Sequence, residues 1–229
     1  MKAKSTWVLV AALGTGGSLD SRDQDILGQR AAAAGTPRGH DPGVWLAQVA
    51  KTFLGTPYVR GRLEVGEGPE RLVCDLQALD CVTFVESSLA LATCLWHDPD
   101  RVAQGFPVEL ARWRYRDGLP KGWASRLHYA SSWAAVHIGR GRLVERTLEL
   151  GGAPEARRID FMSAHPELYA ALAEPANLEA ILREEERLSA VSWPCLPLMP
   201  RARRQEGLLE GDVVLVLSSR PGLDVSHMG

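Results

Sequence analysis

The sequence lacks any apolar run long enough to cross a bilayer, and it has few cysteines and little net charge. Its N-terminal apolar run, Trp7–Leu13, is far shorter than the roughly 20 residues of a transmembrane helix, and no other segment is longer. Four Cys in 229 residues are too few for a disulfide-stabilised scaffold. The 26 Lys and Arg nearly balance 28 Asp and Glu, which excludes the basic surface of a dedicated nucleic-acid-binding protein.

What the sequence contains is the composition of an ordinary folded domain. Hydrophobic residues make up 45% and charged residues 24% of the chain, which excludes a disordered chain and a coiled coil. A typical domain has roughly 150 residues. The length therefore predicts one domain or two small ones.

The first residues have the three parts of a secretory signal. Lys2 and Lys4 precede the apolar run, and small residues follow it at 14–18. We expect residues 1–18 to be a signal segment, residues 19–229 to form the domain, and the protein to be exported or periplasmic. The alternative is a buried first strand in a cytoplasmic protein.

Hydrophobic periodicity predicts several helices. Apolar residues recur at three- and four-residue spacing over 44–54, which indicates an amphipathic helix. A second helix is expected over 101–116. Helical periodicity returns from Pro166, with an interruption at Pro175.

The remaining segments favour extended structure. Residues 123–165 mix short strand-like runs with glycine-containing turns, and Trp193–Pro200 carries three prolines. Val213–Leu217 is a continuous apolar run, which is typical of a buried strand. The segment LDVSHMG at 223–229 begins a further strand.

The most informative segment is LDCVTFVESSLALATCL, residues 79–95. It is apolar around most of a helix circumference, which indicates a central buried helix. Asp80 occupies the N-cap position, so Cys81 lies in the first turn. There the helix dipole favours a thiolate nucleophile, and the free N–H groups favour an oxyanion. The alternative is that Cys81, like Cys94, is a small buried apolar residue.

His227 is the natural partner for such a cysteine. A strand histidine facing a helix N-terminus would complete a Cys–His pair with the imidazole as general base. The alternative is a surface histidine near a chain end. Among the other histidines, His137 lies in an apolar run and is expected in the core, whereas His128 and His165 lie in polar turns.

Taken in order, these segments resemble the NlpC-type cysteine peptidases of bacterial cell walls, and within them the N-acetylmuramoyl-L-alanine amidase-like branch. The resemblance runs from about Trp45 to Gly229. The segments that carry it are FLGTPYV (53–59), LDCVTFVE (79–86), SRLHY (125–129), TLELGG (147–152), FMSAHPELY (161–169), GDVVLV (211–216) and LDVSHMG (223–229).

The resemblance implies an α+β, papain-like NlpC-type fold, in which the nucleophile helix packs on a central antiparallel sheet. It also implies hydrolysis of the amide between the lactyl group of N-acetylmuramic acid and L-Ala, in peptidoglycan or its fragments. The reaction would pass through a cysteine thioester, and neither a metal nor an organic cofactor is expected.

The resemblance also assigns roles to individual residues. Cys81 matches the nucleophile and His227 the base. Tyr58 matches the tyrosine that lies beside this pair. The loop of Arg126, His128 and Tyr129 would line the substrate cleft, where Arg126 suits the carboxylates of a stem peptide. The alternative for all four is structural support of the cleft.

One feature departs from the family pattern. In this superfamily a polar residue on the strand after the histidine orients the imidazole, and this sequence ends at Gly229. We therefore expect a domain that lacks its last strands, with low activity or stability. Two other functions stay open: a non-catalytic muropeptide-binding module, and an endopeptidase directed at D-Glu. The segments SRLHY and FMSAHP favour the amidase.

Overall fold

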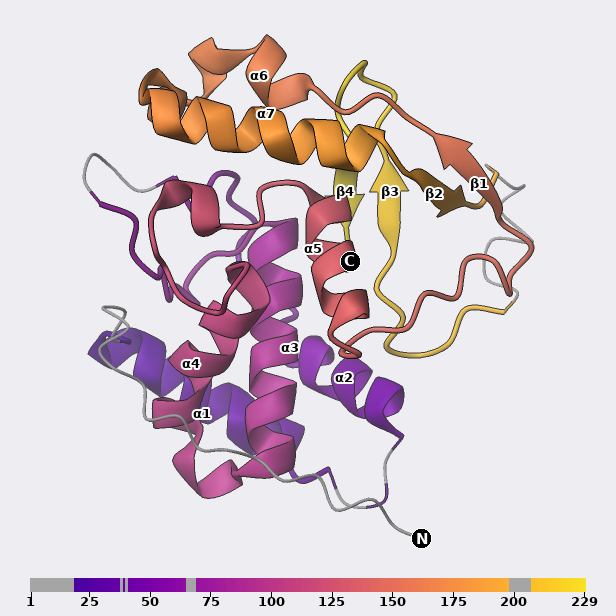
Figure 1. The fold of residues 1–229 in the computed structure, drawn as a ribbon. Coiled ribbons are helices and arrows are strands. Elements are labelled where there is room, and N and C mark those ends of the chain that lie inside the picture. The colour runs from indigo at the N-terminus through magenta and orange to yellow at the C-terminus, as the bar shows by residue number, and fades with distance from the viewer. Residues whose placement is uncertain (1–18, 38, 40, 65–68, 198–206) are drawn as a thin grey trace, which may run out of the picture.

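A computed structural model describes the chain over residues 19–37, 39, 41–64, 69–197 and 207–229. Figure 1 shows a mixed α+β arrangement in which helices dominate. The predicted signal segment, residues 1–18, lies outside the described residues.

The elements have the following bounds. The α-helices are α1 (Ser21–Ala34), α2 (Pro42–Lys51), α3 (Cys81–His97), α4 (Val102–Arg114), α5 (Ala130–Gly139), α6 (Phe161–Ala164) and α7 (Pro175–Ser189). Short 3-10 turns are η1 (Pro99–Arg101), η2 (Trp123–Ser125), η3 (Pro166–Leu168) and η4 (Ala170–Ala173). The strands are β1 (Ala153–Ala156), β2 (Ser192–Cys195), β3 (Leu215–Leu217) and β4 (Val225–Met228).

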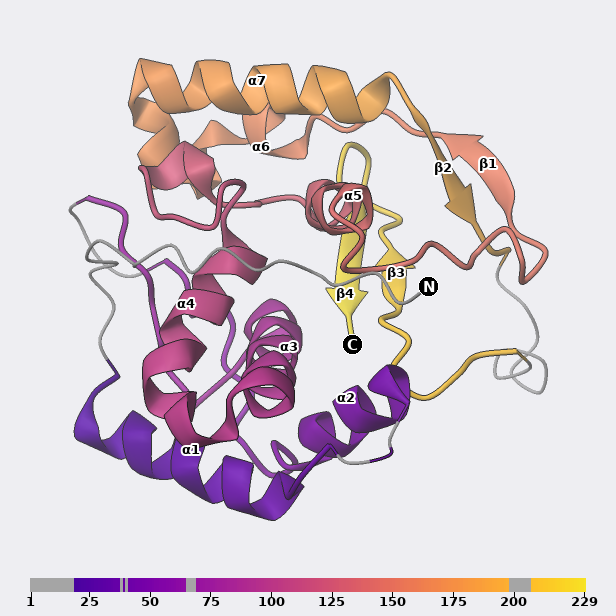
Figure 2. The same cartoon turned by 60° about the horizontal axis from the view of Figure 1, so that its bottom comes forward.

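Helix α3 is the centre of the fold, as its all-round apolar sequence predicts. Figure 2 looks nearly along its axis and shows α2, α4 and β4 around it, and all three pack against it. Ala90 and Leu91 are fully buried. The helix begins with the predicted cap, because Asp80 Oδ1 accepts from Thr83 N at 2.8 Å and Thr83 Oγ1 accepts from Asp80 N at 2.8 Å.

A buried ion pair joins α3 to α4. Arg114 Nε donates to Glu86 Oε2 at 2.7 Å, and both side chains are almost completely buried. Arg114 Nη1 also donates to the carbonyl of Val73, so the guanidinium links both helices to the segment that precedes α3.

Helices α6 and α7 form a second layer across one end of α5 (Figure 1). A separate apolar cluster fills the space beneath α7, and its buried members are Tyr129, Ile159, Met162, Leu172, Ile181 and Leu188. Pro175 is the first residue of α7 rather than an interruption, because proline at N1 removes an N–H that has no partner in the helix.

The strands differ from the expected central sheet. Within the described ranges they form two separate antiparallel pairs, β1–β2 and β3–β4. The predicted buried strand over Val213–Leu217 begins only at Leu215, and Val216 is 49% exposed. Among the described residues this pair has no third strand beside it, and its register shifts between Val216 and Leu217, which are both exposed.

Helix α5 is a feature for which the sequence prediction was wrong. Residues 130–139 were expected as strand-like runs and turns, and they form a helix. Its N-terminal cap comes from far along the chain, because Asp224 Oδ2 accepts from both Ser131 N and Ser131 Oγ at 2.8 Å. A cap 93 residues away leaves no local signal. His137, expected in the core, is fully buried on this helix.

Candidate active site

Cys81 is the first residue of α3 and is half-buried. The Asp80 side chain satisfies Thr83 N, while within the described residues the N–H groups of Cys81 and Val82 have no hydrogen-bond partner. Free N–H groups at a helix start stabilise negative charge nearby. This position therefore suits both a thiolate and the oxyanion formed by its attack on a carbonyl.

Tyr58 lies on the segment that braces this helix start. Val59 N donates to Leu79 O and Leu79 N donates to Pro57 O, each at 3.0 Å, so Tyr58 and Leu79 form a parallel bridge. The Tyr58 side chain is 57% exposed. The structure therefore holds the backbone of Tyr58 beside Leu79, the residue that precedes Asp80 and Cys81, and leaves the Tyr58 ring open to solvent.

His227 lies in β4, opposite Val216 of β3. Strand β4 packs against α3, so the fold brings together the two elements that carry Cys81 and His227. The His227 side chain is exposed while the next residue, Met228, is buried in the core around α3. Within the described residues no hydrogen bond joins Cys81 to His227. In structures without substrate, catalytic hydrogen bonds are often long and tighten only when substrate binds.

Asp224, which the sequence analysis missed, holds the start of β4. It is 5% exposed and accepts from Ser131, as described above, and from Val225 N at 2.7 Å. Burial raises the pKa of Asp224, and the hydrogen bonds from Ser131 oppose this rise. Asp224 lies in the LDVSHMG segment. A carboxylate at the start of a predicted strand is the sequence feature that points to a structural role for this residue.

Arg126 is buried at 5% exposure and is held by the protein itself. Its Nη1 donates to Leu63 O at 2.9 Å, and its Nη2 lies 3.0 Å from Glu64 Oε1. Its Nε lies 3.6 Å from Glu70 Oε1. Arg126 therefore positions the loop that precedes α3.

His128 is fixed as a neutral ring. Its Nε2 lies 2.9 Å from Trp123 O, and the two rings stack with centroids 3.8 Å apart. Burial, aided by the charge of Arg126, lowers the pKa of His128 to about 3. Since a carbonyl only accepts, Nε2 carries the proton and Nδ1 is an acceptor.

Tyr129 supports the second layer. It is 2% exposed, its hydroxyl donates to Glu185 Oε1 at 2.6 Å, and it accepts from Met162 N at 2.9 Å. Ser163 N donates to the same Glu185 oxygen at 3.0 Å. These bonds fix the start of FMSAHPELY against α7.

A cavity of about 370 Å³ is lined by three of the candidate residues, Arg126, His128 and Tyr129. Tyr58, Cys81 and His227 are not among its lining residues. The cavity lies between α7 and the segment 116–132, and it is lined by Arg116, Ala124, Arg126, His128, Tyr129, Ser132, Ala180, Ile181, Arg183, Glu184 and Arg187.

The other cysteines are poor nucleophiles. All four cysteines are free thiols, and burial raises the pKa of Cys74 to about 11 and that of Cys94 to about 12. Cys94 is buried as expected, whereas Cys74 and Cys195 are half-buried. Over the ranges that the structure describes, there is neither a cluster of His, Cys, Asp and Glu suited to a metal ion nor a helix long and apolar enough to span a membrane.

Comparison with known proteins places this arrangement in a family. The profile of the AmiA-like family, described as N-acetylmuramoyl-L-alanine amidase-like, matches residues 48–229. A crystal structure of an N-acetylmuramoyl-L-alanine amidase from Bacteroides uniformis is 34% identical, with a TM-score of 0.73 over 82% of this chain and 79% of that one.

Two further structures are similar. One, described as a putative xylanase from Bacteroides fragilis, is 34% identical with a TM-score of 0.69, covering 79% of each chain. Protein LPG0564 from Legionella pneumophila is 18% identical, with a TM-score of 0.59 over 91% of this chain and 78% of that one, and shares the fold. Curated proteins give no match. The chain belongs to the N-acetylmuramoyl-L-alanine amidase-like family.

Proposed function

We propose that the protein is an NlpC-type cysteine amidase that hydrolyses the amide between N-acetylmuramic acid and L-Ala in peptidoglycan or its fragments. The observation that carries the proposal is Cys81 at the capped start of the central helix, with the His227 strand packed on that helix. Membership of the family supplies the substrate class.

The first half of the reaction follows from these positions. His227 takes the proton of Cys81, and the Sγ thiolate attacks the lactyl carbonyl carbon. The N–H of Cys81 stabilises the oxyanion. The C–N bond then breaks, His227 gives its proton to the departing amine of L-Ala, and a thioester remains on Cys81.

Water completes the cycle. His227 takes a proton from water, and the hydroxide attacks the thioester carbonyl. The C–S bond breaks, the muramic acid leaves with a free carboxyl group, and Cys81 recovers its proton from His227. The enzyme returns to its starting state. In the net reaction, one amide and one water molecule give one carboxylic acid and one amine.

The test is direct. Purified protein is incubated with N-acetylmuramoyl-L-Ala-D-isoglutamine, and the products are identified by mass spectrometry. We expect free L-Ala-D-isoglutamine from the wild type and from Cys195→Ala, a control thiol on β2. Cys81→Ala should release at least a thousandfold less. Release that is unaffected by Cys81→Ala contradicts the proposal.

A second candidate function is muropeptide binding without turnover. It is favoured by the exposed His227 ring, which makes no hydrogen bond to Cys81 within the described residues. Calorimetric binding of the same ligand with no product would support it. On a muropeptide whose stem extends beyond D-Glu, cleavage after D-Glu would give a different product mass and identify the endopeptidase.

We also propose that the protein is exported through residues 1–18, because of the basic, apolar and small residues in that order. Expression with a C-terminal tag, followed by cell fractionation and mass measurement, tests this. Intact protein confined to the cytoplasm contradicts it.

A further inference from the structure

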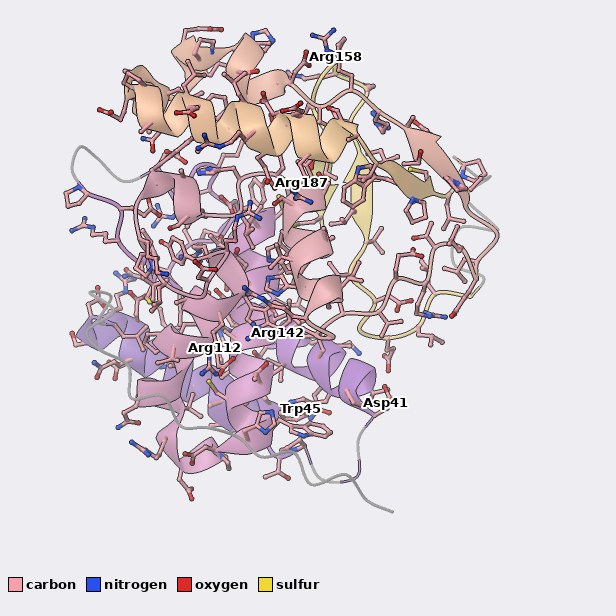
Figure 3. All side chains as sticks on the ribbon, in the orientation of Figure 1. Asp41, Trp45, Arg112, Arg142, Arg158 and Arg187 are labelled. Carbon is pink, nitrogen blue, oxygen red and sulfur yellow. The ribbon has the colours of Figure 1, made fainter. Side chains whose placement is uncertain are left out.

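The cavity beneath α7 has an unusual charge for an acidic chain. Four guanidinium groups line it, against one carboxylate, Glu184, although the whole protein carries −2. The arginines are Arg116, Arg126, Arg183 and Arg187. Figure 3 shows Arg187 between α7 and α5.

Glu184 organises two of these arginines. It accepts from Arg187 Nη2 at 2.7 Å and Nε at 3.0 Å, and it lies 3.0 Å from Arg116 Nη2. Ser132 Oγ donates to it as well. Although burial raises it, the pKa of Glu184 falls to about 2 because Arg187, Ser132 and Arg116 hold the anion. One carboxylate shared by two guanidiniums leaves positive charge uncompensated at this point.

The remaining arginines keep their carboxylate partners outside the cavity. Arg183 pairs with Glu179 on the outer surface of α7, and Arg126 pairs with Glu64 and Glu70 of the preceding loop. The cavity lining includes none of these three carboxylates. The side chains of Arg116 and Arg187 are 39% and 46% exposed, so donors remain accessible to a ligand.

A short loop connects this cavity to Cys81. Arg62 N lies 3.4 Å from Asp80 Oδ2, the cap of the nucleophile helix, and the next residue, Leu63, accepts from Arg126 of the cavity wall. Adjacent residues are about 3.8 Å apart. Residues 62 and 63 thus lie between the cap of the nucleophile helix and the cavity wall, and a peptide of two or three residues spans about 7–10 Å when extended.

We propose that the arginine-lined cavity binds the α-carboxylate of D-Glu in the peptide part of the substrate, with Arg187 and Arg116 as its principal donors. Guanidinium groups bind carboxylates with paired, charge-assisted hydrogen bonds. The proposal rests on the proposed amidase function and extends it, since it predicts that acidic stem peptides are preferred over amidated ones.

The experiment compares two ligands that differ by one charge: N-acetylmuramoyl-L-Ala-D-Glu and N-acetylmuramoyl-L-Ala-D-isoglutamine. We expect Arg187→Met to lower kcat/KM for the acidic ligand about tenfold or more, and for the amidated ligand less than twofold. Arg158→Met is the matched control, since Arg158 also pairs with one carboxylate but lies outside this cavity. An equal loss for both ligands, or no loss, overturns the proposal.

A second variant guards against misfolding. Arg183 has a side chain that is 64% exposed, so Arg183→Glu is compatible with the fold while reversing one charge at the cavity. Arg183→Glu should lower kcat/KM for the acidic ligand more than for the amidated ligand.

Binding separates this proposal from the proposed function. In Cys81→Ala, calorimetry should show tighter binding of the acidic ligand, and Arg187→Met should remove the difference. Turnover by the wild type without such a preference refutes the cavity's role and leaves the amidase. A preference in binding without turnover supports the cavity and refutes the amidase.

Discussion

A buried ion pair joins α3 to α4. The Glu86–Arg114 pair is removed from water on both sides, so each charge depends on the other. Removing one partner leaves an uncompensated ion in a low-dielectric interior, whereas replacing both with apolar residues removes the cost as well as the benefit.

We therefore expect Glu86→Ala to lower the free energy of unfolding by about 3–5 kcal/mol. The double variant Glu86→Leu with Arg114→Met should be considerably more stable than either single variant. Urea denaturation followed by circular dichroism measures all of them. If the double variant loses the sum of the two single losses, the coupling of the pair is refuted.

Two histidines, the buried His137 and the half-buried His128, predict a pH dependence of stability. The pKa of His137 falls to about 4 and that of His128 to about 3, in both cases chiefly through burial. The unfolded chain takes up these protons near pH 6.5, so the unfolded state binds more protons between pH 6.5 and 4. Stability therefore decreases as pH falls through that range.

For His137 alone the loss reaches about 3 kcal/mol at pH 4. His137→Phe should flatten the curve of unfolding free energy against pH over this range, whatever its effect at pH 7. His97→Gln, at an exposed helix end, serves as the control. An unchanged slope in His137→Phe contradicts the assignment.

At the scale of elements, Asp224 joins β4 to α5. It caps α5 through Ser131 and lies directly before the strand that carries His227. The position of that strand therefore depends on a hydrogen bond to a helix rather than on sheet pairing alone.

Asp224→Ala should cost about 1–2 kcal/mol of stability, the usual loss for a helix cap. Asp224→Asn keeps an acceptor oxygen and should cost less. Thermal unfolding measures the cost, and exchange of the Ser131 amide hydrogen, which should accelerate in Asp224→Ala, locates it. Equal behaviour of the two variants argues against the cap.

Local patterns predicted the elements that present Cys81 and His227. The Asp80 cap and the helix start at Cys81 depend on adjacent residues, and so does the extended segment around His227. The start of α5 does not, because its cap is supplied by Asp224. Local sequence also does not indicate that Arg126 forms ion pairs with Glu64 and Glu70, since those contacts join separate loops.

At the scale of the whole molecule, two layers meet through a small polar junction. Glu185 of α7 accepts from Tyr129 and from Ser163 N, and Tyr129 belongs to the same apolar cluster as Leu188. The cavity with Arg187 lies at the same junction, which makes its shape depend on how firmly α7 is held.

We expect Glu185→Ala to leave the Tyr129 hydroxyl and Ser163 N without an acceptor and to destabilise the α6–α7 layer by about 1–3 kcal/mol for each group. Hydrogen exchange followed by mass spectrometry should show that Glu185→Ala accelerates exchange more in residues 161–189 than in α3. Uniform acceleration across the chain would show that the layers unfold together.

The cap of α5 also has a consequence for synthesis on the ribosome. Asp224 is translated 93 residues after Ser131, so over this stretch of elongation α5 has no cap, and the strand that will carry His227 does not yet exist. A contact of such sequence separation forms late and slows folding. The emerging chain therefore carries an uncapped α5 until Asp224 has been synthesised, when one carboxylate can fix the helix and the strand together.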